Sequence, residues 1–144
     1  MVGGRTGRVK AALVLLVVLA ACFWRTYGRA AATHADLLVA LAHKGVDLVA
    51  GGRFTAESMP ELTYPLERAQ AFAARWSGGA APAWMPAFVD LLDRYRALVD
   101  ALDRVRREAK GEAAGAALRE PLARVDAAAD RVRAALAKER GGAA

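Results

Sequence analysis

The stretch that decides the fold is Pro86-Ala-Phe-Val-Asp-Leu-Leu-Asp-Arg-Tyr-Arg-Ala-Leu-Val-Asp-Ala-Leu-Asp-Arg-Val105. Its large apolar side chains recur in steps of three and four, which places them on one face of an α-helix. Acidic residues precede basic ones by four positions off this face, as in Asp90–Arg94, Asp100–Arg104 and Asp103–Arg107. The stretch predicts an amphipathic helix over about 86–110. The positions in the apolar stripe are Phe88, Leu91, Tyr95, Leu98, Leu102 and Val105, with Leu92 and Val99 beside them.

A second stripe follows after a link that contains Gly111 and Gly115. It predicts a helix over about 113–139, beginning near Ala113 or restarting at Pro121. Two such helices joined by a short link predict an antiparallel hairpin. Each repeat lasts under three heptads, which is short for a long coiled coil. The stripe positions are Leu118, Leu122, Val125, Ala129, Val132 and Leu136.

Upstream, two further helices are predicted over about 33–50 and 65–76. Thr33 resembles an N-cap, and Gly51-Gly52 a helix end. A helix that is continuous with the residues before Thr33 remains open as an alternative, since Gly28 is the only helix breaker there. Pro65 suits a first helical turn, so the residues between 53 and 64 read as a connector in which Ser58 caps a short turn. The alternation typical of strands is absent from the sequence. The fold class predicted is all-α, a small bundle of three to four helices.

The N-terminal part has a different character. An apolar run from Ala11 to Trp24 is bounded by Lys10 and Arg25. A membrane-spanning helix needs about 20 apolar residues, and a run of this length is typical of a signal-peptide core or a short anchor. We therefore expect residues 1–29 to be a signal peptide or signal-anchor helix with basic flanks, and residues 30–144 to be one helical domain.

The end of the apolar run, Leu19-Ala20-Ala21-Cys22, resembles the lipobox of bacterial lipoproteins. The resemblance covers only the first 22 residues. It implies that the Cys22 thiol is acylated and that the peptide before it is removed. An uncleaved signal anchor and ordinary secretion remain open as alternatives. In each of them the basic lead favours export of the residues after about 25, so we expect a protein of the cell envelope with membrane lipid as a partner.

Composition narrows the class of protein further. The chain has no Ile and no Asn, and its 17 Arg outnumber its 4 Lys, a bias that favours a GC-rich bacterial source. Five of the six net positive charges flank the apolar run, and the remainder from Ala30 onward is nearly neutral. Because a nucleic-acid binder carries its excess charge on a folded face, no nucleic-acid partner is expected.

The sequence offers little chemistry for catalysis. His34 and His43 are nine residues apart, which places them on opposite faces of a helix and excludes a shared metal ion. Cys22 is the only cysteine, and Ser58 and Ser77 lie in no nucleophile motif. We therefore expect no enzyme activity, no catalytic residue, no metal and no cofactor.

Trp76, Trp84 and Met85 form the one group of large side chains around a predicted loop. They either close the end of the bundle core or line a ligand pocket or a partner-docking edge. The function we expect is that of a membrane-tethered interaction or scaffold protein, with a protein partner or a second copy of the chain. The alternative is a bundle that binds or senses a small apolar ligand.

Overall fold

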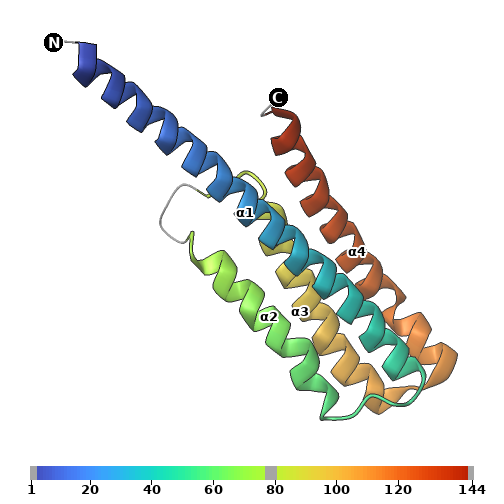
Figure 1. Ribbon diagram of the computed structural model, residues 1–144. Helices are drawn as coiled ribbons and strands as arrows, with labels where there is room; N and C mark the ends of the chain where they lie inside the picture. Colours follow the sequence, from blue (N-terminus) through green and yellow to red (C-terminus); the bar gives the residue numbers. More distant parts are fainter. Residues whose placement is uncertain (1–2, 77–80, 143–144) are drawn as a thin grey trace. The chain divides into compact units, whose positions relative to one another are not determined.

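The computed structural model describes residues 3–76 and 81–142, and the regular structure in this part of the chain is α-helical. Figure 1 shows the four helices, which are α1 (Gly3–Ala50), α2 (Ser58–Ala74), α3 (Met85–Glu108) and α4 (Gly111–Gly142). The chain divides into two compact units, Met1–Ala31 and Ala32–Ala144. The division lies two residues after the predicted boundary. The prediction of an all-α fold with three to four helices is confirmed, and the number is four.

The second unit, called the bundle below, contains residues 32–50 of α1 together with α2, α3 and α4. Successive segments run in opposite directions, and α3 and α4 form the predicted antiparallel hairpin (Figure 1). Lys44 of α1 pairs with Glu61 of α2, and Asp36 of α1 pairs with Arg133 of α4. The four segments therefore close into an up-down-up-down bundle.

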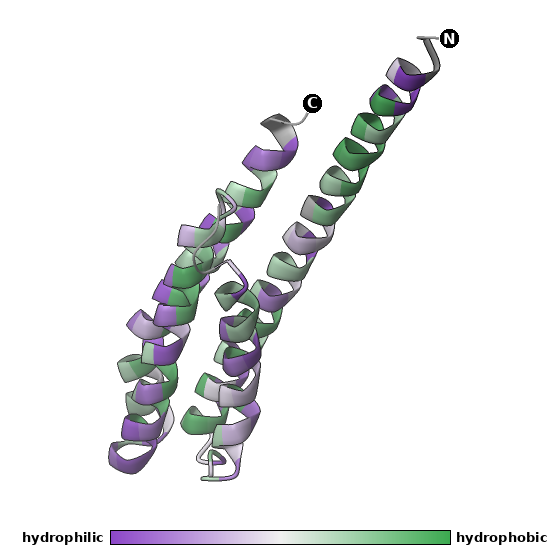
Figure 2. Cartoon of the chain, turned by 90° about the vertical axis from the view of Figure 1, so that its left-hand side faces the viewer, coloured by the Kyte–Doolittle hydropathy of each residue, from purple (hydrophilic) through white to green (hydrophobic). Residues whose placement is uncertain are grey.

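The core of the bundle follows the predicted stripes. All eight predicted core positions of α3 are at most 5% exposed, and five of the six in α4 are buried, with Leu122 partly exposed. Figure 2 shows apolar and polar residues alternating around these helices. Two of the predicted ion pairs form, Asp90–Arg94 at 3.5 Å and Asp103–Arg107 at 3.0 Å. Asp103 also pairs with Arg106, at 2.8 Å, and Asp100 with Arg104 does not form an ion pair.

The start of α2 differs from the prediction. The helix begins at Ser58 rather than at Pro65, which lies inside it, and ends at Ala74 rather than at 76. Pro65 removes one main-chain hydrogen bond. Burial of an apolar stripe compensates for this loss and carries the helix through the proline; its members are Leu62, Leu66, Ala69 and Phe72. The Ser58 side chain does not cap the helix but accepts a hydrogen bond from the main-chain N–H of Thr55, at 3.1 Å.

The prediction of an N-cap at Thr33 is wrong, because α1 is continuous from Gly3 to Ala50. One glycine, such as Gly28, costs a helix about 1 kcal/mol, and the Arg-Ala-Ala-Ala run that follows it favours the helix. At its end, Gly52 adopts φ +68°. The N–H of Arg53 donates to the Leu48 carbonyl at 2.8 Å, and that of Gly52 to Val49 at 3.1 Å. These two bonds form the Schellman end that the Gly51-Gly52 pair predicts.

The hairpin turn is short. Helix α3 ends at Glu108, two residues before the predicted end, and Ala109 is extended. Helix α4 begins at Gly111, whose φ of +64° reverses the chain at little steric cost. It continues through Pro121 without a restart and reaches Gly142. Residues 77–80 of the predicted loop lie outside the described residues.

Candidate functional site

The first unit presents an apolar helical surface. Residues 11–24, called the anchor segment below, lie within α1. The seven residues from Leu13 to Leu19 are each 51–66% exposed. Seven consecutive residues cover every direction around a helix, so the exposed apolar surface is a full belt rather than a stripe. By length and composition, α1 is apolar enough to cross a membrane.

Exposure of this belt to water is unfavourable in free energy. Full burial of a Leu or Val side chain is worth roughly 1.5–3 kcal/mol, so transfer of seven half-exposed side chains to hydrocarbon gives on the order of 10 kcal/mol. Cys22 lies within the anchor segment and is exposed. Its carbonyl accepts a hydrogen bond from the Thr26 hydroxyl, at 2.9 Å. The thiol is therefore accessible where the lipobox resemblance needs it.

In the bundle, the predicted aromatic residues come together at the end where α2 finishes and α3 begins. Trp76 and Trp84 lie edge to face with ring centroids 5.6 Å apart, and Phe72 and Phe88 pack against Trp84 at 6.0 and 5.9 Å. These four residues are called the aromatic cluster below. Trp84 is fully buried, Met85 is 7% exposed, and Trp76 is partly exposed. Trp84 and Met85 thus occupy core positions that close this end of the bundle.

One polar atom in this cluster has no partner. The indole nitrogen of Trp84 is buried without a hydrogen bond to any described residue. A buried N–H of this kind costs free energy, which the packing of three neighbouring aromatic rings offsets.

His34 extends the aromatic cluster onto α1. Its ring lies 5.0 Å from Phe72 and 6.3 Å from Phe88. Burial lowers the pKa of His34 below its ordinary value, and the guanidinium groups of Arg68 and Arg75 lower it further. The imidazole is therefore held in its neutral form by an apolar and positively charged environment.

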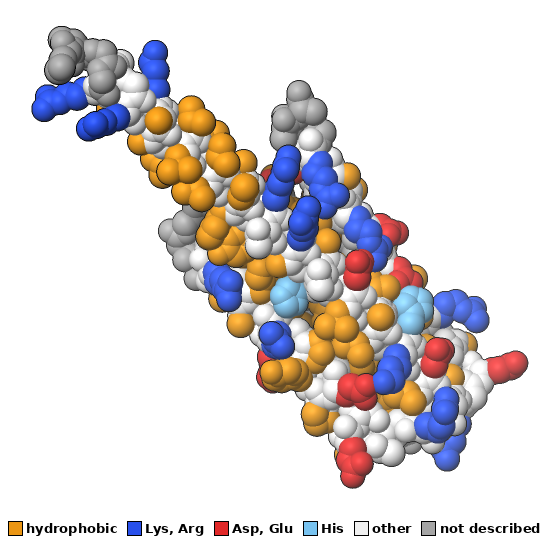
Figure 3. Space-filling model, in the orientation of Figure 1, with side chains coloured by type: hydrophobic (Ala, Val, Ile, Leu, Met, Phe, Trp, Pro, Cys, Tyr) orange, Lys and Arg blue, Asp and Glu red, His pale blue; other side chains and the backbone are white. Residues whose placement is uncertain are grey.

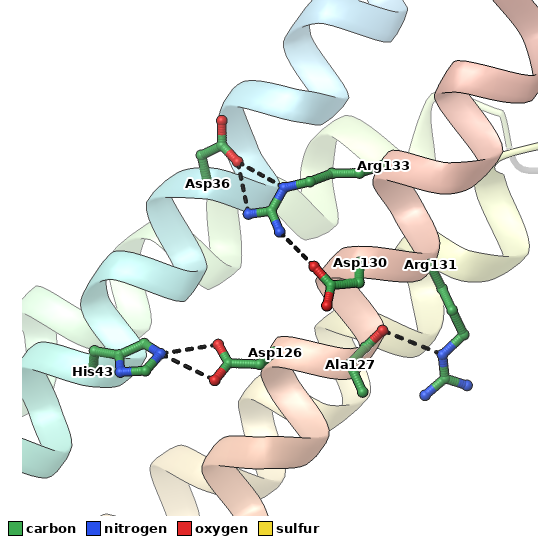
Figure 4. A network of polar contacts seen from close by, with 7 residues as sticks. All are labelled: Asp36, His43, Asp126, Ala127, Asp130, Arg131 and Arg133. Carbon is green, nitrogen blue, oxygen red and sulfur yellow. Dashed lines mark hydrogen bonds and ion pairs between the residues drawn. The ribbon is translucent and has the colours of Figure 1, made fainter.

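His43 faces the opposite neighbour, as the nine-residue spacing predicts. Its Nε2 lies 2.9 and 3.1 Å from the two carboxylate oxygens of Asp126 on α4 (Figure 4). The same seam between α1 and α4 holds Arg133, which donates to Asp36 at 3.0 Å and to Asp130 at 2.9 Å. These hydrogen bonds raise the pKa of Arg133, with Asp36 as the larger cause. Sequence reasoning missed this seam, because its partners are far apart in the chain.

The polar and ionisable side chains of the described residues have surroundings that fit structural roles. Among them no charged side chain is buried, and no group of three His, Cys, Asp or Glu side chains is placed to hold a metal ion. The one buried hydroxyl in the α2–α3 interface belongs to Tyr95, which donates to the Leu62 carbonyl at 2.8 Å. Burial raises the pKa of Tyr95, so this hydroxyl stays protonated as a structural donor.

Comparison of the chain with protein-family models, with curated proteins and with solved structures finds no match.

Proposed function

We propose that the protein is a membrane-tethered helical interaction or scaffold protein of the bacterial cell envelope, without catalytic activity. The observation that carries the proposal is the exposed apolar belt of Leu13–Leu19 beside a separate bundle with its own core. Every described buried residue larger than alanine belongs to residues 32–144. The bundle therefore needs nothing from the anchor segment for its core, and hydrocarbon is the environment that suits the belt.

The basic residues before the anchor segment support export of the bundle. Arg5, Arg8 and Lys10 precede the belt, and positively charged flanks favour the cytoplasmic side. The topology is tested with Ser58→Cys in a Cys22→Ala background, treated with a membrane-impermeant maleimide. Labelling of the introduced thiol in intact spheroplasts, without lysis, is the expected result. Labelling only after lysis would place the bundle in the cytoplasm.

Cys22 is proposed as the lipidation site, and the uncleaved anchor is kept as the competing form. Incorporation of labelled fatty acid into the wild type and its loss in Cys22→Ala is the expected result. The variant should also accumulate a precursor that retains the first 21 residues. Absence of label in both proteins leaves the uncleaved anchor as the tether and refutes the lipoprotein form.

The surface of the bundle supports an interaction role. Large apolar side chains remain exposed on it, at 46% for Leu37, 59% for Tyr64 and 41% for Val89. No described charged side chain is buried in the manner of a catalytic acid or base. Sedimentation of residues 30–144 over a range of concentrations tests self-association, and chemical cross-linking of the anchored chain in its own membrane tests a protein partner.

The alternative is a bundle that binds a small apolar ligand. The observation in its favour is an open, shallow groove between α2 and α3, whose lining residues are Gln70, Ala73, Ala74, Val89, Leu92 and Asp93. Saturable binding of an apolar dye by monomeric residues 30–144, lost in Val89→Asp, would favour the carrier over the scaffold. Concentration-dependent association without dye uptake would favour the scaffold.

A further inference from the structure

A cluster of basic side chains lies at the seam between α1 and α2. The His34 ring packs on Phe72 of α2, with ring centroids 5.0 Å apart. Arg68 and Arg75 lie four residues before and three residues after Phe72, on the same face of the helix. The charges of both arginines act on the His34 imidazole. These three residues, His34, Arg68 and Arg75, are called the basic seam below.

Two acidic side chains of α1 and α2 are paired with other basic residues. Glu61 of α2 pairs with Lys44, and Asp36 of α1 pairs with Arg133. Neither Arg68 nor Arg75 has a carboxylate of a described residue within 4.0 Å, and the guanidinium of Arg68 lies over the Tyr64 ring at 5.8 Å from its centroid. Figure 3 shows Lys and Arg side chains, histidines and acidic side chains spread over the face of the molecule that it draws. Burial lowers the pKa of His34, and the charges of Arg68 and Arg75 lower it further.

His34 of the basic seam is close in the chain to the anchor segment. Eight Cα–Cα steps separate Trp24, the last residue of the anchor segment, from Ala32, the first of the bundle. A chain of this length spans at most about 28 Å, whatever its conformation. His34 lies two residues further on, whereas residues 32–50 extend about 28 Å along their helix to the opposite end of the bundle. The basic seam therefore lies at the end of the bundle that the chain joins to the anchor segment.

We propose that the basic seam binds the phosphate groups of anionic phospholipids in the membrane that holds the anchor segment. Two guanidinium groups supply paired N–H donors for a phosphate, and arginine is suited to this geometry. Trp76 follows Arg75 directly and is partly exposed, and an indole beside basic side chains is typical of the headgroup region. The bundle then lies against the bilayer instead of moving freely on its tether. The proposal rests on the anchor segment of the proposed function.

The test uses the full chain reconstituted into vesicles, with Trp24→Phe to remove the tryptophan of the anchor segment. Flotation with zwitterionic vesicles reports the anchor, and quenching of Trp76 by lipids brominated near the headgroup reports the seam. Trp84 is fully buried and contributes a constant emission. We expect quenching in vesicles with anionic phosphatidylglycerol to exceed that in pure phosphatidylcholine by roughly twofold or more. The excess should vanish in about 1 M salt, where the Debye length is about 3 Å.

A matched pair of variants assigns the effect. Arg68→Gln/Arg75→Gln should bring quenching in anionic vesicles down to the zwitterionic level. Arg104→Gln/Arg119→Gln removes the same charge from two exposed arginines that form no ion pair with a described residue, and should retain the excess.

Equal loss in both variants, or no dependence on anionic lipid, would overturn the proposal. So would loss of the excess on adding inorganic phosphate at constant ionic strength, because soluble phosphate would then be the preferred ligand. A chain that fails to float overturns the anchor, whereas a chain that floats without lipid-dependent quenching overturns the seam alone.

Discussion

Tyr95 of α3 donates its phenolic hydrogen to the main-chain carbonyl of Leu62 on α2, across 2.8 Å inside the core. Leu62 follows Glu61, whose carbonyl lacks its usual helical donor because Pro65 has no N–H. A large side chain from the neighbouring helix thus ties the weakened turn of α2 to the best-packed helix of the bundle. The hydrogen bond therefore helps to hold α2 against α3 about one turn before the proline.

Tyr95→Phe should lower the free energy of unfolding by about 1 kcal/mol, because it removes one buried hydrogen bond while the ring still fills its site. Urea denaturation of residues 30–144, followed by circular dichroism, measures the change. Tyr64→Phe is the matched control, since Tyr64 is 59% exposed and its hydroxyl is free to bond to water. Equal effects of the two substitutions would show that the Tyr95–Leu62 bond contributes nothing specific.

The close approach of α1 to its neighbours supplies a second prediction. A Cβ added at Gly45 would lie 2.7 Å from Leu102 Cδ1 and 3.3 Å from Leu62 Cδ1. Both leucines are at most 2% exposed, so neither side chain has room to move away. Gly45→Ala should therefore lose about 1 kcal/mol net, since overpacking exceeds the gain in helix propensity.

Gly115→Ala is the control for that substitution. Gly115 lies inside α4, and an added Cβ would meet nothing within 4 Å. The same change should there raise the free energy of unfolding by about 1 kcal/mol. Thermal unfolding of the two variants should shift in opposite directions, and a shift in the same direction would contradict the close packing at Gly45.

The apolar stripes of α3 and α4 were predictable because each helix buries one face against the others, and the period of 3.6 is visible in the sequence. The eight core positions of α3 are the clearest case. The start of α2 was not predictable in the same way. Local chemistry at Pro65 favours a helix start, and the burial of Leu62 that carries the helix upstream depends on a contact with a residue 33 positions away.

Some of the candidate functional residues were predictable from the sequence, and others depend on contacts between distant parts of the chain. The anchor segment is visible in the sequence as an apolar run, and Cys22 as the residue that follows two small ones near its end. Trp84 lies between two prolines in the sequence, at 82 and 86, which predicts a loop. Its full burial results from packing against the rings of Phe72 and Phe88. The basic seam was not predictable from the sequence, because it depends on the contact between His34 and Phe72, which are far apart in the chain.

The environment of His34 makes stability depend on pH. The native pKa of His34 lies below the ordinary value of 6.5, so the unfolded chain takes up a proton at higher pH than the folded chain. The contribution of His34 is fully present above about pH 6.5 and is lost as the pH falls toward the native pKa. The free energy of unfolding should therefore decrease on acidification from neutral pH to about pH 5.

Two variants isolate this effect, since the chain has only two histidines. His34→Gln should flatten the decrease between neutral pH and about pH 5, whereas His43→Gln should leave the part due to His34 in place. Denaturant titrations at a series of pH values measure the slope. A slope that His34→Gln leaves unchanged would contradict the lowered pKa of the half-buried imidazole.

The anchor segment gives the sharpest prediction, because the same substitution has a matched site in the bundle. Val17 lies in the middle of the belt and is 66% exposed, and Val89 on α3 is 41% exposed. Arginine at the centre of an apolar segment costs insertion about 2.5–3.5 kcal/mol, a sizeable share of the free energy, on the order of 10 kcal/mol, that the belt gains in hydrocarbon. Both variants, Val17→Arg and Val89→Arg, are made in a Cys22→Ala background, so that the anchor segment stays on the chain. There Val17→Arg should move much of the protein from the membrane pellet to the soluble fraction after carbonate extraction. Val89→Arg should leave the protein in the pellet.

Both variants should keep the helical circular dichroism of the bundle, because its core contains neither side chain. Retention of Val17→Arg in the membrane, with Val89→Arg released, would mean that the bundle rather than the belt holds the protein there.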